Sequence, residues 1–131
     1  MNLRTARDEL AAGIAAADLE LTGYPRPPGK VGRFPAAIVR DPTAIRYHTA
    51  RAVRIEVDLP VFVLVSRSAA QDGTAALDEL VSSLPGVIDE LTGSWETIVA
   101  HELAGGYVDF AQASELVAVG AVINTRLVFK S

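Results

Sequence analysis

The chain has 131 residues, a formal net charge of −4 and no cysteine. This length favours a single domain over residues 1–131, large enough for a core without disulfides. The lack of cysteine excludes a thiolate nucleophile and a cysteine-based metal site. The longest apolar run is far below the roughly 18 residues that span a bilayer, so no membrane association is expected. The acids within MNLRTARDELAAG argue against a secretory signal, and we expect cytoplasmic synthesis.

The first half of the chain shows a helical pattern followed by short strands. Apolar residues recur at helical spacing over residues 3–17, with Asn2 or Thr5 as candidate caps. Short strands are expected at 19–21, 36–39 and 43–49, the last with Ile45 and Tyr47 pointing inward. The strongest strand pattern covers residues 53–65, where Pro60 predicts a bulge or an edge position.

The second half predicts a helix and two further strands. Residues 66–73 are polar and predict a connection, and residues 77–88 carry an apolar helical stripe that Pro85 and Gly86 are expected to divide. Gly93 occupies the place of a left-handed helix terminator. A strand over 95–103 is expected to break at 105–107, and a long strand is expected over 115–130, with a bulge at Gly120. Strands that follow one another without crossover helices predict an α+β fold, an antiparallel or mixed sheet with two to three helices mainly on one face.

Positive charge is concentrated in one part of the sequence. Residues 24–54 hold seven basic residues and one acid, Asp41, so this part carries +6 and the remainder carries −10. Two interpretations are open: opposite charges on different faces, or loops and half-buried strands that are merely rich in arginine. The net negative charge speaks against a general nucleic-acid binder.

The proline-rich segment, 24-YPRPPGKVGRFPAAIVRDP-42, contains five of the seven prolines. Its Gly29-Lys30 pair resembles part of a phosphate-binding loop, but Gly23 stands one residue too far away and Val31 replaces the required hydroxyl. Proline also has no N–H to offer a phosphate. The segment is too short for a domain linker, which leaves an ordered arm.

No catalytic, cofactor-binding or metal-binding constellation emerges from the residue pattern. His48 and His101 stand 53 residues apart without paired ligand spacing, so structural histidines are the better interpretation. No serine lies in a nucleophile elbow. The acid pairs Asp78-Glu79 and Asp89-Glu90 match a solvated helix surface. Trp95 and Tyr107 are candidate surface anchors, although such aromatics are more often part of the core edge.

The chain resembles the tail terminator (tail completion) proteins of long-tailed bacteriophages with non-contractile tails, especially phages of actinobacteria. The resemblance rests on the element order and on 3-LRTARDELAAGIA-15, 23-GYPRPPGKVGRFPAAIV-39, 61-VFVLVSR-67 and 70-AQDGTAALDEL-80. It implies a virion structural protein without enzymatic activity or cofactor, located at the head-proximal end of the tail and assembled in the host cytoplasm. It further implies a homo-oligomeric ring, typically a hexamer, that contacts the tail tube protein and the head-closure or connector protein. DNA would pass through its channel without sequence-specific binding.

The charge pattern adds a hypothesis about the contacts between subunits. Stiff prolines lower the entropy cost of docking the arm. Its Arg26, Lys30 and Arg33 would reach the acidic helix surface around residues 78–79 and 89–90 of the adjacent subunit, or else a tube or connector protein. Alternatives are another connector or head-closure subunit, or a small ligand-binding or enzyme domain. The interface candidates are Tyr24, Arg26, Lys30, Arg33, Asp78, Glu79, Asp89, Glu90, Trp95 and Tyr107.

Overall fold

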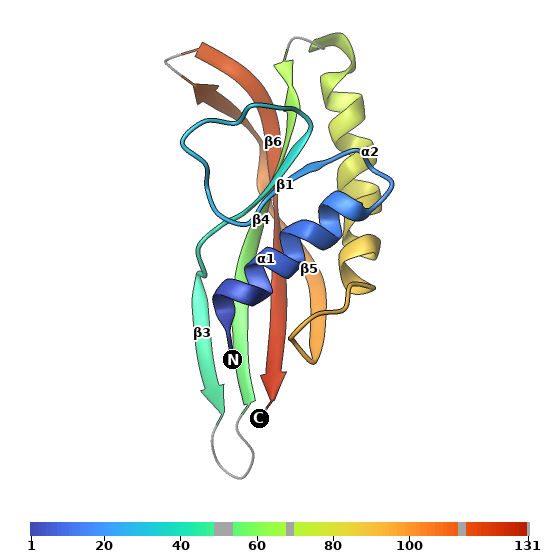
Figure 1. The fold of residues 1–131 in the computed structure, drawn as a ribbon. Helices are drawn as coiled ribbons and strands as arrows, with labels where there is room; N and C mark the ends of the chain where they lie inside the picture. Colours follow the sequence, from blue (N-terminus) through green and yellow to red (C-terminus); the bar gives the residue numbers. More distant parts are fainter. Residues whose placement is uncertain (49–53, 68–69, 113–114, 131) are drawn as a thin grey trace.

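Six strands form one mixed sheet, and two helices pack on one of its faces (Figure 1). This computed structural model describes residues 1–48, 54–67, 70–112 and 115–130. The α+β expectation is confirmed, with two helices in the described part of the chain. In chain order the elements are α1 (Leu3–Ala16), β1 (Thr22–Tyr24), β2 (Ala36–Val39), β3 (Ala44–His48), β4 (Arg54–Ser66), α2 (Ala70–Asp89), β5 (Thr97–Gln112) and β6 (Glu115–Lys130).

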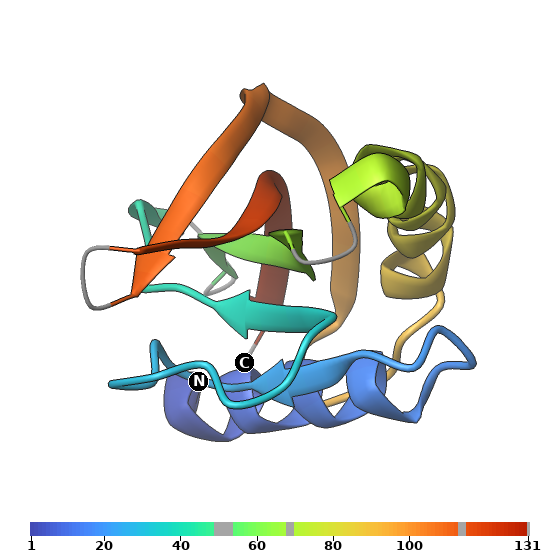
Figure 2. The same ribbon diagram turned by 90° about the horizontal axis from the view of Figure 1, so that it is seen from above.

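The long strand β4 organises the sheet. One of its edges pairs along its whole length with β6, and β6 pairs with β5. Its other edge is shared, since β2 pairs with residues 61–64 and β3 pairs with residues 54–58. All of these pairs are antiparallel, and the short β1 adds to β2 in parallel. The sheet is strongly curved (Figure 2).

The main core lies between the sheet and both helices. The helix stripes predicted from the sequence are buried here, including Leu10 and Ile14 of α1 and Leu84 of α2. They meet the alternate residues of β4 and β6 that share the helix face, such as Val61 and Leu127. Each large apolar side chain buried in this way stabilises the fold by about 1.5–3 kcal/mol. In Figure 2, α1 runs beneath β1 and β2, while α2 runs alongside β5.

The opposite face of the sheet carries a smaller core under the loop of residues 25–35, which belongs to the proline-rich segment. Val31 of this loop packs with Ile38 of β2, Leu64 of β4 and Ala118 of β6. Phe62 and Phe110 meet edge to face beside this cluster, with ring centroids 6.1 Å apart. The loop therefore covers apolar surface that two helices on one face leave open.

Several local expectations are confirmed. Asn2, rather than Thr5, caps α1, because its side chain accepts a hydrogen bond from the Thr5 N–H at 3.0 Å. The strands predicted at 36–39, 53–65 and 115–130 are β2, β4 and β6, apart from Val53, which lies outside the described residues.

Other expectations about the first half of the chain are wrong. The first strand is at 22–24, not 19–21. Ile45 and Tyr47 of β3 are on the helix face, as expected, but they are not buried. They are 40% and 64% exposed, because α1 packs on β1 and β2 rather than over β3. Pro60 produces neither a bulge nor an edge position. It pairs in register with Asn124, and its missing N–H falls in the gap between β2 and β3, where its carbonyl accepts from the Arg40 N–H.

The second half of the chain is more continuous than its prolines and glycines predict. Helix α2 begins at Ala70, within the predicted connection, and continues past Pro85 to Asp89 as one helix. Gly93 does not have a positive φ. Strand β5 continues through residues 105–107, since a register shift between Ala104 and Val108 takes up the extra residues and Gly105 adopts a φ of +67°.

Gly120 forms no bulge, and the pairing of β6 with β4 is uninterrupted there. The absence of a side chain at Gly120 allows β6 to pack closely against β4. A Cβ atom at this position would lie 2.6 Å from both the Leu64 Cδ2 atom and the Val63 carbonyl oxygen.

Candidate interaction surface

The proline-rich segment folds back on its own chain. The Nε of the buried Arg7 donates to the Pro25 carbonyl at 3.0 Å, which fixes the start of the loop against α1. The Gln112 side chain holds the middle of the loop through two hydrogen bonds to the backbone of Val31. Its Oε1 accepts from the Val31 N–H at 2.5 Å, and its Nε2 donates to the Val31 carbonyl at 3.4 Å. The segment is thus an ordered part of the domain.

The three basic residues at the tip of this segment differ in their surroundings. Arg26 is paired within the chain, since it donates to Asp8 at 3.0 Å and to the Arg4 carbonyl at 3.4 Å. Lys30 and Arg33 are exposed and form no ion pair with any described residue. Two of the three predicted basic contacts are therefore available to a partner.

The acids of α2 also divide into two kinds. Asp78 accepts a short hydrogen bond from the Tyr107 hydroxyl, and this bond raises the pKa of Tyr107 to about 12 because it favours the neutral phenol. Asp89 accepts from the Ala100 N–H at 2.7 Å. Both acids therefore tie α2 to β5. Glu79 and Glu90 are exposed and have no ion-pair partner among the described residues.

The aromatic candidates are less exposed than a surface anchor needs to be. The interpretation of Trp95 as an anchor is wrong, because its indole is 6% exposed and its Nε1 donates to the Leu91 carbonyl at 3.4 Å. Tyr24 and Tyr107 are half-buried. The Tyr24 hydroxyl accepts from the Gly32 N–H at 3.3 Å, so this residue serves the loop of its own chain.

The available charges lie on different elements of the chain, and Glu79 lines one hollow with Phe34, the residue that follows Arg33. Both ribbon views place the loop of residues 25–35, which carries Lys30 and Arg33, on one side of the sheet (Figures 1 and 2). Helix α2, which carries Glu79 and ends one residue before Glu90, lies on the other side. Three other basic residues of 24–54 pair with acids of the same chain, Arg26 with Asp8, Arg46 with Asp58 and Arg54 with Glu56, so only part of the positive charge of this segment is available to a partner.

A second charged group, absent from the predicted candidates, lies on the face of the sheet opposite the helices. Asp58 of β4 accepts from Arg46 of β3 at 2.8 Å and from Arg126 of β6 at 2.9 Å. Burial favours the neutral acid, but the hydrogen bonds from the two arginines outweigh it and hold the pKa of Asp58 below its ordinary value. Beside it, Glu56 pairs with Arg54 at 3.1 Å. The alternation in β4 marks this face as polar, but the partners come from strands whose pairing the sequence pattern does not specify.

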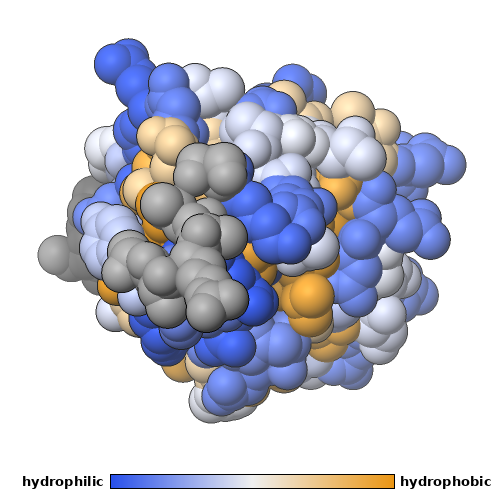
Figure 3. Space-filling view, turned by 90° about the horizontal axis from the view of Figure 1, so that it is seen from below, coloured by the Kyte–Doolittle hydropathy of each residue, from blue (hydrophilic) through white to orange (hydrophobic). Residues whose placement is uncertain are grey.

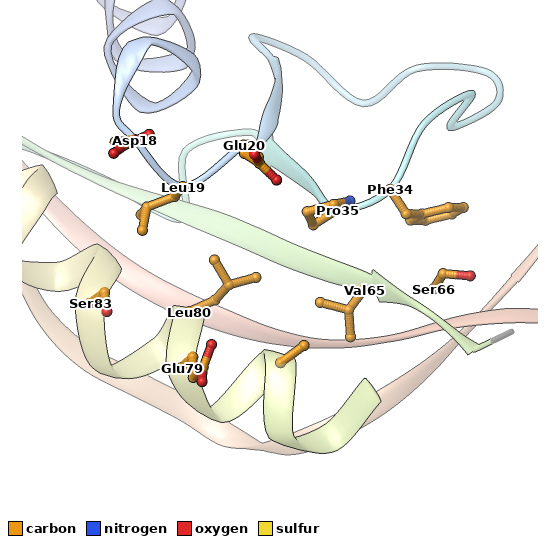
Figure 4. A pocket seen from close by; sticks show the side chains of 11 residues that line it. Asp18, Leu19, Glu20, Phe34, Pro35, Val65, Ser66, Glu79, Leu80 and Ser83 are labelled. Carbon is orange, nitrogen blue, oxygen red and sulfur yellow. The ribbon is translucent and has the colours of Figure 1, made fainter. Parts of the chain in front are cut away.

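A hollow of about 560 Å³ opens between the end of α1, the proline-rich segment and α2 (Figure 4). Its acids are Asp18, Glu20 and Glu79, and they stand beside the apolar Phe34 and Leu80. Glu20 and Glu79 come from opposite walls of the hollow, one from the chain after α1 and the other from α2. The polar groups therefore do not converge on one point.

The histidines lie far apart in the sheet. His48 is on β3, 3.7 Å from Glu56, and His101 is on β5 at the other edge. Within the described ranges, no group of three or more His, Asp or Glu residues is placed to hold a metal ion. No described helix has the length and apolar character needed to cross a membrane. Seen from below, the surface is largely hydrophilic, with separate hydrophobic areas (Figure 3).

Comparison of the sequence with protein-family models and with curated proteins gives no match.

Proposed function

We propose that this chain is a tail terminator protein of a long-tailed bacteriophage with a non-contractile tail. In this role its copies form a ring, typically a hexamer, that caps the tail tube and stops its polymerisation. The ring then presents the surface that the head-closure or connector protein joins, and DNA passes through its channel. The protein acts as a structural part of the virion, without an enzymatic reaction or a cofactor.

The observation that carries this proposal is that different elements of one chain expose positive and negative side chains without ion-pair partners among the described residues. A ring requires head-to-tail contacts, in which one patch of a subunit meets a different patch of its neighbour. Lys30 and Arg33 on the loop of residues 25–35, and Glu79 and Glu90 on and just after α2, supply two such patches of opposite charge. Complementary charges of this kind direct association and select the orientation of the partners. The quoted sequence phrases supply the remaining support, since they resemble terminators over nearly the whole chain.

The contact is tested by charge reversal and charge exchange in the phage that encodes the chain. Phage lacking the gene would be supplied with K30E/R33E, with E79K/E90K, or with all four substitutions in one chain. We expect each double variant to lower the yield of joined particles, and the fourfold variant to recover much of it, because the charges again attract. R4E is the matched control, since Arg4 is exposed on α1, outside both patches. Full yield from both double variants would refute this contact.

A further inference from the structure

Part of the sheet has the strand order β3–β4–β6–β5. In this part, the outer edges of β3 and β5 have no partner strand among the described residues. Within the described residues, β3 pairs with β4 alone and β5 pairs with β6 alone. Unpaired edges expose backbone N–H and C=O groups and readily accept a strand from another chain. Proteins usually shield such edges, yet both of these strands expose large apolar side chains.

Each edge exposes a large apolar side chain on the helix face, and β5 also exposes Val99 and Val108 on the other face. Tyr47 of β3 pairs with Ile55, and Leu103 of β5 pairs with the core residue Ile123. Tyr47 is 64% exposed and Leu103 is 43% exposed. A hollow of about 230 Å³ lies beside Leu103, lined by residues of α2, β5 and β6 that include Val81 and Pro85.

On the face opposite the helices, the edge strands β3 and β5 carry side chains of opposite charge. Arg46 of β3 projects there, since it reaches Asp58 on that face. On β5, Glu102 pairs with Asn124 and is exposed on the same face. If the sheet continues from β5 into a second β3, apolar residues meet on one face and Arg46 approaches Glu102 on the other.

We propose that β3 of one copy adds to β5 of the next copy as an antiparallel strand, with Tyr47 entering the hollow beside Leu103. The geometry favours this because the four strands alternate in direction. A neighbour related by rotation about an axis along the strands then presents its β3 antiparallel to β5. Such a head-to-tail contact leaves the other edge free for a further copy and closes when the rotation completes a ring.

Helix α2 limits where along β5 the added strand can form backbone hydrogen bonds. Asp89 already accepts from the Ala100 N–H, so the added strand pairs with β5 beyond this residue. The inference rests on the proposed function and specifies which strands meet.

The absence of cysteine from the sequence allows a direct test in the purified full-length chain. H48C and A104C each place one thiol on the face opposite the helices, on β3 and β5 respectively. The two variants, one with a size tag, are mixed and treated with a short bismaleimide, which tolerates the spacing of diagonal cross-strand neighbours, about 7–8 Å. We expect mixed dimers of H48C with A104C, and few dimers from either variant alone. Equal dimer formation by H48C alone, or none in the mixture, would overturn the inference.

A second measurement uses sedimentation equilibrium at protein concentrations up to about 1 mM, which detects association as weak as about −4 kcal/mol. Y47A is expected to weaken association by about thirtyfold, as for a residue at the centre of an interface. L116A is the matched control, because Leu116 is 57% exposed but lies on β6. An unchanged Y47A, or a wild-type chain that stays monomeric, would overturn the strand pairing. It would leave the proposed terminator intact, since that role is decided by tail length in the phage.

Discussion

Replacing Asp58 with asparagine removes the charge that joins three strands on the face opposite the helices. The Asp58 side chain is 14% exposed and accepts charge-assisted hydrogen bonds from Arg46 of β3 and Arg126 of β6. The substitution keeps the shape of the side chain and removes the attraction. It leaves two guanidinium groups near one another without the anion between them.

The expected loss of stability follows from the exposure of the three partners. A hydrogen bond to a charged group contributes about 1.5–3 kcal/mol when buried. Arg46 and Arg126 are 43% and 40% exposed, so water replaces part of each bond and the loss is smaller than for buried partners. The total loss expected for D58N is about 1–2 kcal/mol. For a chain of 131 residues this corresponds to a fall in Tm of about 4–7 °C.

The pH dependence of the stability difference distinguishes the loss of the Asp58 charge from a loss of packing. Because the folded state lowers the pKa of Asp58, its stabilisation is fully present above the ordinary aspartate value of about 3.9. It is lost as the pH falls through the folded pKa, below that value. Melting followed by circular dichroism should therefore show the full difference between wild type and D58N near pH 7 and a smaller difference near pH 3.

The control is D109N, which breaks a single more exposed pair with Arg67 and should cost less than about 0.5 kcal/mol. Equal Tm values for wild type and D58N at pH 7 would refute the reasoning. So would a difference that stays the same at pH 3.

Three further predictions concern the packing of the domain. Arg7→Ala should lower the free energy of unfolding in urea by about 2–4 kcal/mol, because it strands the buried Val39 carbonyl that Arg7 contacts at 3.2 Å, whereas Arg4→Ala should change it little. Gly120→Ala should cost about 1–3 kcal/mol in the same assay, since the added Cβ meets backbone as well as side chain, and an unchanged midpoint would contradict this. In a titration followed by ultraviolet absorbance, the Tyr107 phenol should ionise near pH 12, and D78N should lower that value; three tyrosines that titrate alike would contradict it.

The sequence predicted elements whose side-chain pattern is local and regular. The apolar stripes of α1 and α2 and the alternation in β4 and β6 depend on one element meeting one core, so periodicity was sufficient. The breaks predicted from proline and glycine were wrong where the tertiary structure accommodates these residues within a continuous element. Pro60 lies in a gap between two partner strands, and Gly105 belongs to an irregular stretch of a continuous strand.

The candidate surface was less predictable, because exposure depends on which element covers which. Tyr47 alternates like a core residue, but neither helix extends over β3. Asp78 and Asp89 match a solvated helix surface in sequence, yet both are used to hold β5. The cluster at Asp58 joins residues up to 80 positions apart, and such pairings follow from the order of the strands, which periodicity does not encode.

The most direct test of the proposed function is electron microscopy of particles made by a phage that carries this gene, with the gene disrupted. A terminator predicts filled heads beside unattached tail tubes of abnormal length, because nothing stops the polymerisation of the tube. Unattached tails of normal length would contradict termination and move the protein to the connector side of the joint. Intact, infectious particles would contradict any essential role at the junction between head and tail.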